Sequence, residues 1–303
     1  MCYKSGEIYV RNLRSAANTD IYTFASDRTE TFVPSYTSHG FRYIEITGNG
    51  FTLLNNSIIE SIEAIVIHNL DEDTSSFECS NALVNQLYSN ILWGQRDNFL
   101  LVPTDCPQRN ERQGWTGDMQ VFAATASYNM DIKEFTRKWL VDLIDAQELY
   151  NKSGAVPDTA PLGGDNRADG CAGWGDAAII VPWELYMAYG DKSILSDCYD
   201  MMIKWVTYQS STERQNNGER TVNGVSAPSD LSTSPFIQVQ QRRGDHLALD
   251  ETTPFILSAT AYAAYVSKLL SKIAEILDKP QDSEKYKKRF EDIKQAFNEA
   301  WVQ

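Results

Sequence analysis

The chain has 303 residues, a formal net charge of -14 at pH 7 and five cysteines. Its length is sufficient for a large hydrophobic core, in one large domain or in a small domain joined to a larger one. The acidic charge argues against a nucleic-acid groove, which needs a basic stripe. The sequence also has no uninterrupted apolar stretch of about 18 residues, the length that would predict a membrane span. The cysteines are scattered and include no C-x-x-C pair, so we expect free thiols and neither a disulfide framework nor a zinc site. They are Cys2, Cys79, Cys106, Cys171 and Cys198.

The first 70 residues alternate polar and apolar side chains in the manner of β-strands. The alternating runs are 7–10, 20–24, 41–46 and 61–68, and turn residues separate them at intervals typical of a β-sandwich. No charged region followed by an apolar region opens the chain, so the chain as written carries no predicted signal peptide. We therefore expect a cytoplasmic location, with the alternative left open that a signal peptide precedes this stretch in a longer protein.

From Asn81 onward the apolar side chains repeat with the period of helices. Two connections are exceptions, because residues 154–165 are rich in proline and glycine and residues 212–243 are polar and rich in turn formers. The pattern thus predicts a mainly helical chain after the strand region. The predicted helices run from Asn81 to before Pro103 and over 117–128, 131–150, 176–189, 193–210, 254–277 and 282–301.

The connection between the first two predicted helices, residues 105–118, is unusually dense in charged groups. Within it, Glu111 and Asp118 flank Trp115. This arrangement suits a carbohydrate site, because an aromatic face stacks on a sugar ring and a carboxyl group accepts hydroxyl protons or protonates a glycosidic oxygen. The other interpretation is a capped loop, with Asp118 as a helix-start carboxylate and the two arginines of the loop as its surface partners. The residue types alone leave both interpretations open.

The run DCPQRNERQGWTGDMQ resembles the central motif of the bacterial α-L-rhamnosidases, glycoside hydrolase family 78, in which this motif carries the catalytic acid. Four more segments are similar to family segments in family order: RNLRSAANTDIYTF, HGFRYIEITG, AGWGDAAIIVPW and TPFILSATAYAAYVSKLLSKIAEIL. The resemblance extends from about Arg11 to the C-terminal end. It implies a mainly α protein, with the C-terminal part of a β-sandwich domain in residues 1–75 and the N-terminal part of an (α/α)6 toroid in residues 76–303.

The resemblance implies a glycoside hydrolase that removes terminal α-L-rhamnose from glycosides or polysaccharides by an inverting acid and base mechanism. Glu111 is the expected general acid, and its alternative role is a surface salt bridge. Partial burial against Trp115 and the neighbouring aspartates should favour its protonated form, whereas Arg109 and Arg112 should oppose it. Because only about seven of the family's twelve helices are predicted, we expect the general base to lie beyond the C-terminus.

The same motif supplies most of the expected substrate contacts. Asp105 and Asp118 match family aspartates that hold sugar hydroxyls, Arg109 is also expected to bind the substrate, and Trp115 is expected to form a wall of the pocket. The alternatives are a turn residue for Asp105, a helix cap for Asp118 and simple core packing for Trp115. A capping aspartate keeps one oxygen available, so the two roles of Asp118 are compatible.

Further substrate contacts are expected from two later segments. Trp174 follows a loop and is expected to contact the methyl-bearing face of rhamnose. Asp176, two residues on, is assigned equally to a helix cap and to a ligand contact. Asp245 is expected in the pocket, and His246 stands where the family commonly has a tryptophan, which alters the stacking contact at that subsite. The remaining helical tryptophans, Trp139, Trp183, Trp205 and Trp301, are predicted to belong to the core.

The chain contains neither a glycine-rich phosphate loop nor metal-ligand spacing, so we predict no cofactor and no metal. The expected partner is a rhamnose-containing glycoside or polysaccharide, with no nucleic acid and no membrane. Two alternatives remain: a non-catalytic carbohydrate-binding or scaffold fragment, and a different (α/α)6 glycosidase or lyase. A toroid that lacks about five helices leaves apolar faces without partners. We therefore expect the chain alone to aggregate or self-associate through the open side of the toroid and to release no rhamnose.

Overall fold

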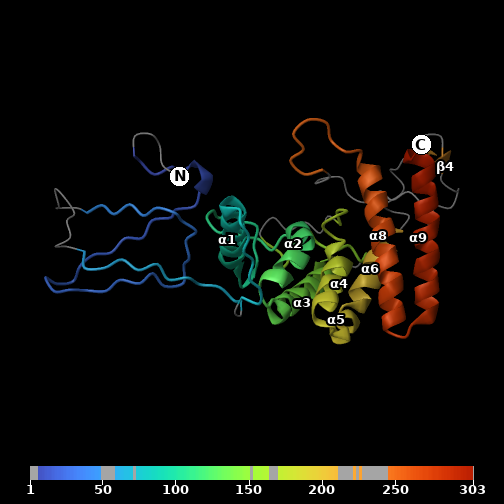
Figure 1. Cartoon of the computed structure of the whole chain (residues 1–303), viewed down its shortest axis with the longest axis horizontal. Helices are drawn as coiled ribbons and strands as arrows, with labels where there is room; N and C mark the ends of the chain where they lie inside the picture. The colour runs from blue at the N-terminus through green and yellow to red at the C-terminus, as the bar shows by residue number, and fades with distance from the viewer. Residues whose placement is uncertain are drawn as a thin grey trace.

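The computed structural model describes residues 6–48, 59–70, 73–150, 153–163, 170–210, 221–222, 225–226 and 245–302. Within these ranges an N-terminal part of extended segments leads into a helical part (Figure 1). Several features predicted from the sequence lie outside the described residues. They are Cys2, the last two residues of the 154–165 loop and most of the polar connection over 212–243.

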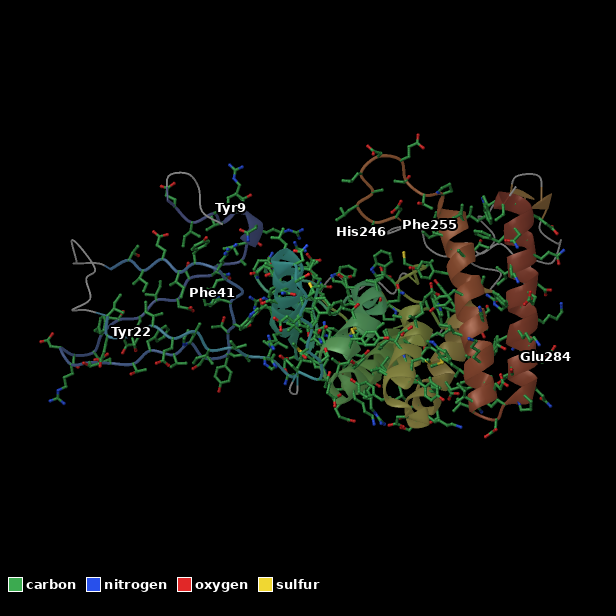
Figure 2. All side chains as sticks on the ribbon, in the orientation of Figure 1. Tyr9, Tyr22, Phe41, His246, Phe255 and Glu284 are labelled. Atoms are coloured by element: carbon green, nitrogen blue, oxygen red, sulfur yellow. The ribbon has the colours of Figure 1, made fainter. Side chains whose placement is uncertain are left out.

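The N-terminal part, residues 6–70, is extended as the alternating pattern predicts, but its runs do not form the expected strands. Beyond a single bridge at Ile8, its described residues contain only one regular element, the 3-10 helix η1 (Arg11–Leu13). Many apolar side chains point away from the backbone into solvent, as Figure 2 shows around Tyr22 and Phe41. Strands need a covered apolar face and paired neighbours to be stable, and nothing described in this part covers that face.

The helical part begins with α1 (Ala82–Asn98), where the Asn81 side chain accepts a hydrogen bond from the Leu83 N–H at 3.0 Å and so caps the helix. Two short antiparallel strands follow, β1 (Phe99–Leu100) and β2 (Val102–Pro103). They turn the chain back on itself before it enters the motif loop, and α2 (Thr116–Asn129) begins where that loop ends. The first helix therefore ends before Pro103, as predicted, and residues 99–103 that follow it form a short hairpin.

The later helices follow the predicted pattern to within a few residues at each end, with one correction. The single helix predicted over 193–210 is two helices that meet at Cys198. In the C-terminal region α8 and α9 form a hairpin of two long helices lying side by side (Figure 1). The elements after α2 are α3 (Lys133–Tyr150), α4 (Ala177–Tyr189), α5 (Lys192–Asp197), α6 (Tyr199–Gln209), β3 (Thr221–Val222), β4 (Val225–Ser226), α8 (Phe255–Ile276) and α9 (Pro280–Trp301).

The hydrophobic core is organised around α4, which contacts α2, α3, α5, α6 and α8. The first half of α4 is buried on all sides, as expected for a helix surrounded by other helices. Trp139 and Trp205 are completely buried, which confirms the prediction that they belong to the core, and Trp183 packs against its edge. Trp301 packs against a small second cluster at the end of α9.

Two further observations concern the described ranges. No disulfide joins Cys79, Cys106, Cys171 or Cys198. None of the helices described combines the length and the hydrophobicity that crossing a bilayer requires.

Candidate active site

The motif loop, residues 104–115, is closed at its base by Asp105. The Asp105 N–H donates to the Gln113 carbonyl at 3.2 Å, and the Gln113 N–H donates to Asp105 Oδ1 at 3.0 Å. The Asp105 side chain is only 7% exposed. Asp105 thus has the turn-closing role that was its alternative interpretation, and its second oxygen, Oδ2, faces the rest of the motif.

The end of the motif is pinned to a second loop by backbone pairing. Trp115 bridges Thr159 in antiparallel fashion, because the Thr116 N–H donates to the Asp158 carbonyl and the Ala160 N–H donates to the Gly114 carbonyl, each at 2.9 Å. A Cβ atom on Gly114 would lie 2.1 Å from the Ala160 oxygen, so only glycine permits this approach. The pairing fixes the start of α2 and the backbone at Trp115.

Glu111 has three donors close to its two carboxyl oxygens. Its Oε1 accepts the Trp115 indole N–H at 3.1 Å, and its Oε2 lies 2.8 Å from Arg109 Nη2 and 3.0 Å from Arg14 Nη1. The side chain is 22% exposed, so one side of the carboxyl group remains open to solvent. Trp115 therefore serves Glu111 as a hydrogen-bond donor, a role that differs from the purely apolar contact expected from the sequence.

The arginines of the motif divide their roles. Arg109 bridges two carboxylates, since its Nη2 also lies 3.2 Å from Asp105 Oδ2. Arg112 turns away from Glu111 and donates to the Ser38 carbonyl at 2.7 Å, which corrects the expectation that it would act on the acid. The second arginine that contacts Glu111 is Arg14, which was not predicted from the sequence.

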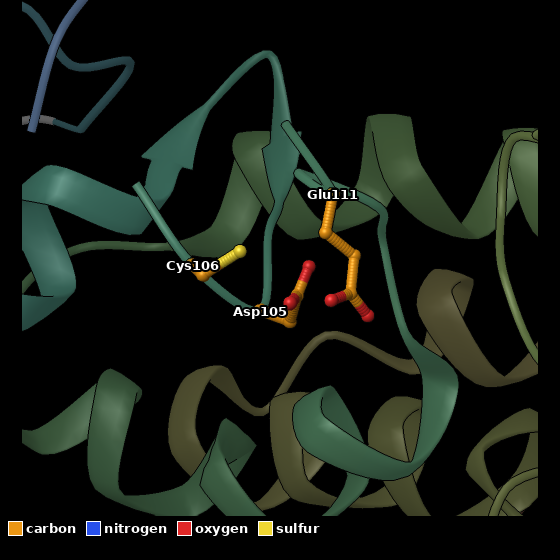
Figure 3. A group of neighbouring side chains, drawn as sticks. All are labelled: Asp105, Cys106 and Glu111. Atoms are coloured by element: carbon orange, nitrogen blue, oxygen red, sulfur yellow. The ribbon is translucent and has the colours of Figure 1, made fainter. Parts of the chain in front are cut away.

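Asp105, Cys106 and Glu111 bring three potential metal-ligand atoms within 4.8 Å of one another, and Figure 3 shows the two carboxyl groups facing each other. The donor set does not suit a metal. The Arg109 guanidinium already balances both carboxylates. Burial raises the pKa of the Cys106 thiol, which keeps it protonated and a poor ligand. The cluster is better described as an arginine-bridged carboxylate pair.

Asp118 lies in the first turn of α2 and reaches solvent. The N-cap of that helix is Trp115, so Asp118 is not the cap that its alternative interpretation required. Desolvation by the surrounding protein raises the pKa of Asp118, the negative charge of Asp105 adds to the effect, and His246 opposes it. These surroundings favour the protonated form of Asp118 more than water does.

Trp174 and His246 lie next to Asp118. The Trp174 ring rests on the backbone of Gly117, where an added Cβ would come within 2.6 Å of the indole. The His246 ring stands edge-on to Trp174 with centroids 6.0 Å apart, although 72 residues separate them in the sequence. Figure 2 places His246 on the loop that precedes α8. The first turn of α2 is therefore bordered by two ring systems that the sequence analysis assigned to sugar binding.

Asp245 and Asp176 have other partners. Asp245 is exposed, and its Oδ2 accepts from the Thr253 N–H and hydroxyl at 3.2 and 2.9 Å, so it ties the loop before α8. Asp176 is completely buried and makes no helix-cap bond. It accepts from the Gly173 N–H, the Trp205 indole and the Gln209 amide, and burial raises its pKa to about 6. Asp176 thus occupies the predicted N-cap position of α4 without a side-chain capping bond, and its complete burial argues against the alternative ligand contact.

The structure thus brings Glu111, Asp105, Arg109 and Trp115 into direct contact and sets Asp118, Trp174 and His246 together. That both groups line a single pocket stays a prediction. Arg14 was missed because no spacing rule relates residues 97 positions apart. The only available signal was the resemblance of the RNLRSAANTD segment, which carried no role for the arginine.

Two family models match the chain. One, described as the bacterial alpha-L-rhamnosidase 6 hairpin glycosidase domain, matches residues 72–303. The other, described as the bacterial alpha-L-rhamnosidase concanavalin-like domain, matches residues 1–68. The first match contains every site residue predicted from the sequence, and Arg14 falls in the second.

Similar proteins and structures carry the same name. An alpha-L-rhamnosidase of Streptomyces avermitilis is 42% identical over 297 residues, covering 98% of this chain and 26% of the relative, and one of Formosa agariphila is 35% identical over 304 residues, covering 99% and 30%. The crystal structure of the Streptomyces avermitilis enzyme complexed with L-rhamnose matches all of this chain and 26% of its own, with 39% identity and a TM-score of 0.82.

A native alpha-L-rhamnosidase from Aspergillus terreus matches 99% of this chain and 33% of its own, with 33% identity and a TM-score of 0.82. The chain therefore spans about a quarter to a third of the length of these proteins. Together with the helices described above, the matches confirm the predicted fold class, part of a six-hairpin helical toroid after a different N-terminal domain.

Proposed function

This chain belongs to the bacterial α-L-rhamnosidase family, and on that basis we propose that the protein containing it hydrolyses terminal α-L-rhamnosyl groups of glycosides or polysaccharides. The observation that carries the proposal is the placement of Glu111. It is a partly exposed carboxyl group held by Trp115 and Arg109 beside a second carboxylate, Asp105. Such a group suits proton transfer to a glycosidic oxygen.

In the proposed mechanism Glu111 is the general acid. Its proton passes to the oxygen that joins rhamnose to the leaving group, the bond from the anomeric carbon to that oxygen breaks, and its electron pair remains on the departing oxygen. Glu111 is then a carboxylate, which the Trp115 and Arg109 donors are placed to stabilise. The closed base of the motif loop at Asp105 fixes the backbone from which Glu111 projects.

The proposed stereochemical outcome is inversion. A second carboxylate, roughly 6.5–9.5 Å from the acid, would activate a water on the opposite face of the sugar. We assign that base to no residue of this chain. Because the chain spans about a quarter to a third of the length of its relatives, we propose that the base belongs to the remainder of the longer protein.

Asp118, Trp174 and His246 are proposed to hold the sugar. The Asp118 carboxyl group can accept hydrogen bonds from sugar hydroxyls, and the desolvation that raises its pKa also favours the protonated form, which can donate one. The adjoining ring of Trp174 offers an apolar face for the methyl group of a 6-deoxy sugar. His246 lies edge-on to Trp174, and its ring can hydrogen-bond to a sugar hydroxyl.

The proposal is tested by measuring release of p-nitrophenol from p-nitrophenyl α-L-rhamnoside. The assay should compare this chain with a longer form that completes the toroid. We expect hydrolysis by the longer form and none by residues 1–303 alone. A longer form that is folded but inactive on aryl, alkyl and sugar-linked rhamnosides would contradict the proposed function. Rhamnose release by the chain alone would place the base within it.

The second candidate, a non-catalytic carbohydrate-binding fragment, concerns this chain by itself. It draws on the location of Asp118, Trp174 and His246, all within the chain and grouped independently of the missing base. Calorimetry with L-rhamnose distinguishes the two: binding by the inactive chain supports the fragment role, and absence of binding by both forms contradicts it.

A further inference from the structure

The N-terminal part reaches the motif loop through a set of polar contacts. The Asn110 amide donates to Ser15 Oγ at 2.8 Å, and the Asn18 amide donates to the Gln108 carbonyl at 3.2 Å. Arg112 donates to the Ser38 carbonyl at 2.7 Å. Nearby, Gly40 lies so close to Pro107 that a Cβ on Gly40 would be 2.9 Å from the proline carbonyl carbon. Two stretches of the N-terminal part, 15–18 and 38–40, therefore dock on the loop that carries Glu111.

Arg14 stands at the edge of this contact with its guanidinium on Glu111. Its Nη1 lies 3.0 Å from Glu111 Oε2, and its side chain is 61% exposed against 22% for Glu111. Arg14 is therefore on the solvent side of the carboxyl group. Its backbone has φ 55 and ψ -114, a region that non-glycine residues rarely occupy. Strain of this kind persists where the surroundings over-determine a conformation, and it is concentrated at functional sites.

Arg109 does not by itself supply all of the positive charge that can stabilise the Glu111 carboxylate. Arg109 shares its charge between Asp105 and Glu111, and its Nε is buried without a hydrogen-bond partner. Glu111 thus receives only part of the stabilisation that one arginine provides. The Arg14 guanidinium contacts no other carboxylate among the ion pairs of the described residues, so its charge acts on Glu111.

We propose that Arg14, contributed by the N-terminal part of the chain, is a positioning residue that stabilises the carboxylate of Glu111 as this acid releases its proton. The inference rests on the proposed function, in which the proton moves from Glu111 to the leaving oxygen as the glycosidic bond breaks. A cation beside Glu111 stabilises the carboxylate as its negative charge develops in the transition state. The N-terminal domain is then a component of the catalytic centre.

This role predicts a dependence on the leaving group. A poor leaving group, such as an alkoxide or a sugar hydroxyl, needs protonation, whereas 2,4-dinitrophenolate departs with little help from an acid. In a longer, active form of the protein, Arg14→Gln should lower kcat roughly three- to fivefold for a methyl or disaccharide rhamnoside, the loss expected for one largely exposed ion pair. For 2,4-dinitrophenyl α-L-rhamnoside, kcat should change by less than a factor of about 1.5.

Two variants control the experiment. Arg14→Lys keeps the charge and should recover most of the alkyl-rhamnoside activity. Arg28→Gln removes an exposed arginine of the same N-terminal part, whose backbone N–H bonds to Ser26 Oγ and which forms no ion pair among those of the described residues, and should leave both substrates unaffected. Equal losses on both substrates with Arg14→Gln would show that Arg14 only supports the fold, and no loss on either would also overturn the proposal.

The failure of the proposed function would be recognised separately. If the wild-type longer form hydrolysed neither substrate, the family activity itself would be wrong for this protein. If the wild type hydrolysed both and Arg14→Gln changed neither selectively, only the role of Arg14 would be wrong.

Discussion

The N-terminal and helical parts of this molecule differ in how far their apolar side chains are buried. In the helical part Trp139, Leu143 and Leu195 have no exposed surface. In the N-terminal part Ile21 is 86% exposed and Ile65 is 67% exposed. The hydrophobic effect therefore stabilises the helical part directly and does little within the described residues of the N-terminal part.

The comparison shows that stability and site chemistry are distributed differently over the chain. The N-terminal part contributes little core, yet it supplies Arg14 to Glu111 and receives hydrogen bonds from Asn110 and Arg112. Each such bond is worth only about 0.5–1.5 kcal/mol, so the docking is polar and orienting. A part with little packing of its own can still determine the electrostatics of the site.

The largest expected effect concerns the helical part. In a longer, active form, Glu111→Gln should reduce turnover by about 10²- to 10⁴-fold, because the amide keeps the shape of the side chain and has no proton to transfer. Sugar binding should change little. The matched control is Glu284→Gln on the exposed face of α9 (Figure 2), which should retain activity. Near-normal turnover of Glu111→Gln would mean that another residue is the acid.

The second prediction compares the cores of the two parts. Trp139→Ala should lower the free energy of unfolding by about 3–5 kcal/mol, because it leaves a cavity and removes the indole bond to the Ala160 carbonyl at 2.8 Å. Ile21→Ala, at an exposed position of the N-terminal part, should change it by about 0.5 kcal/mol or less. Urea unfolding followed by circular dichroism measures both. Similar losses would show that Ile21 is buried in solution.

The helices were predictable because their signals are local. The Asn81 cap and the apolar period define the start of α1, and Pro280 stands at the start of α9. The break between α5 and α6 at Cys198 was missed, since no glycine or proline marks it. The N-terminal runs were correctly predicted as extended, but pairing depends on partners that local alternation does not report.

The site was predictable only as far as one contiguous motif extends. Residues 105–118 are close in sequence, so the contacts of Glu111 with Arg109 and Trp115 followed from the motif. Arg14 and the true surroundings of Asp176 depend on residues brought together from distant segments. Burial decides the role of Asp176, and its flanking sequence resembles that of an ordinary helix cap.

The third prediction concerns pH and the buried carboxyl group of Asp176. Its folded pKa of about 6 lies above that of an unfolded aspartate, about 3.9, so the folded state binds an extra proton between these values. The stability from this proton is fully present below about pH 4 and is lost as the pH rises through 6, a change of about 3 kcal/mol. Unfolding by urea at pH 4, 5, 6 and 7 measures it.

Two aspartate variants isolate that contribution. Asp176→Asn cannot titrate, so its stability should vary less between pH 4 and 6 than that of the wild type, and Asp145→Asn, at an exposed position of α3, should follow the wild type. If Asp176→Asn does not fold, the wild type and Asp145→Asn still decide the question. Wild-type stability that rises steadily from pH 4 to 7 would contradict the buried, proton-binding carboxyl group.

The smallest expected effect concerns association of the chain by itself. Leu83 and Leu87 on α1 are 81% and 57% exposed, and a large apolar side chain gains roughly 1.5–3 kcal/mol on full burial. We predict that residues 1–303 aggregate or self-associate and that Leu87→Lys lowers the associated fraction severalfold in light scattering, since it charges an apolar face of the partial toroid. Ile21→Lys makes the same change in the N-terminal part. If Ile21→Lys lowers the associated fraction and Leu87→Lys does not, the surface that mediates association belongs to the N-terminal part. A monodisperse wild-type monomer would contradict the predicted association.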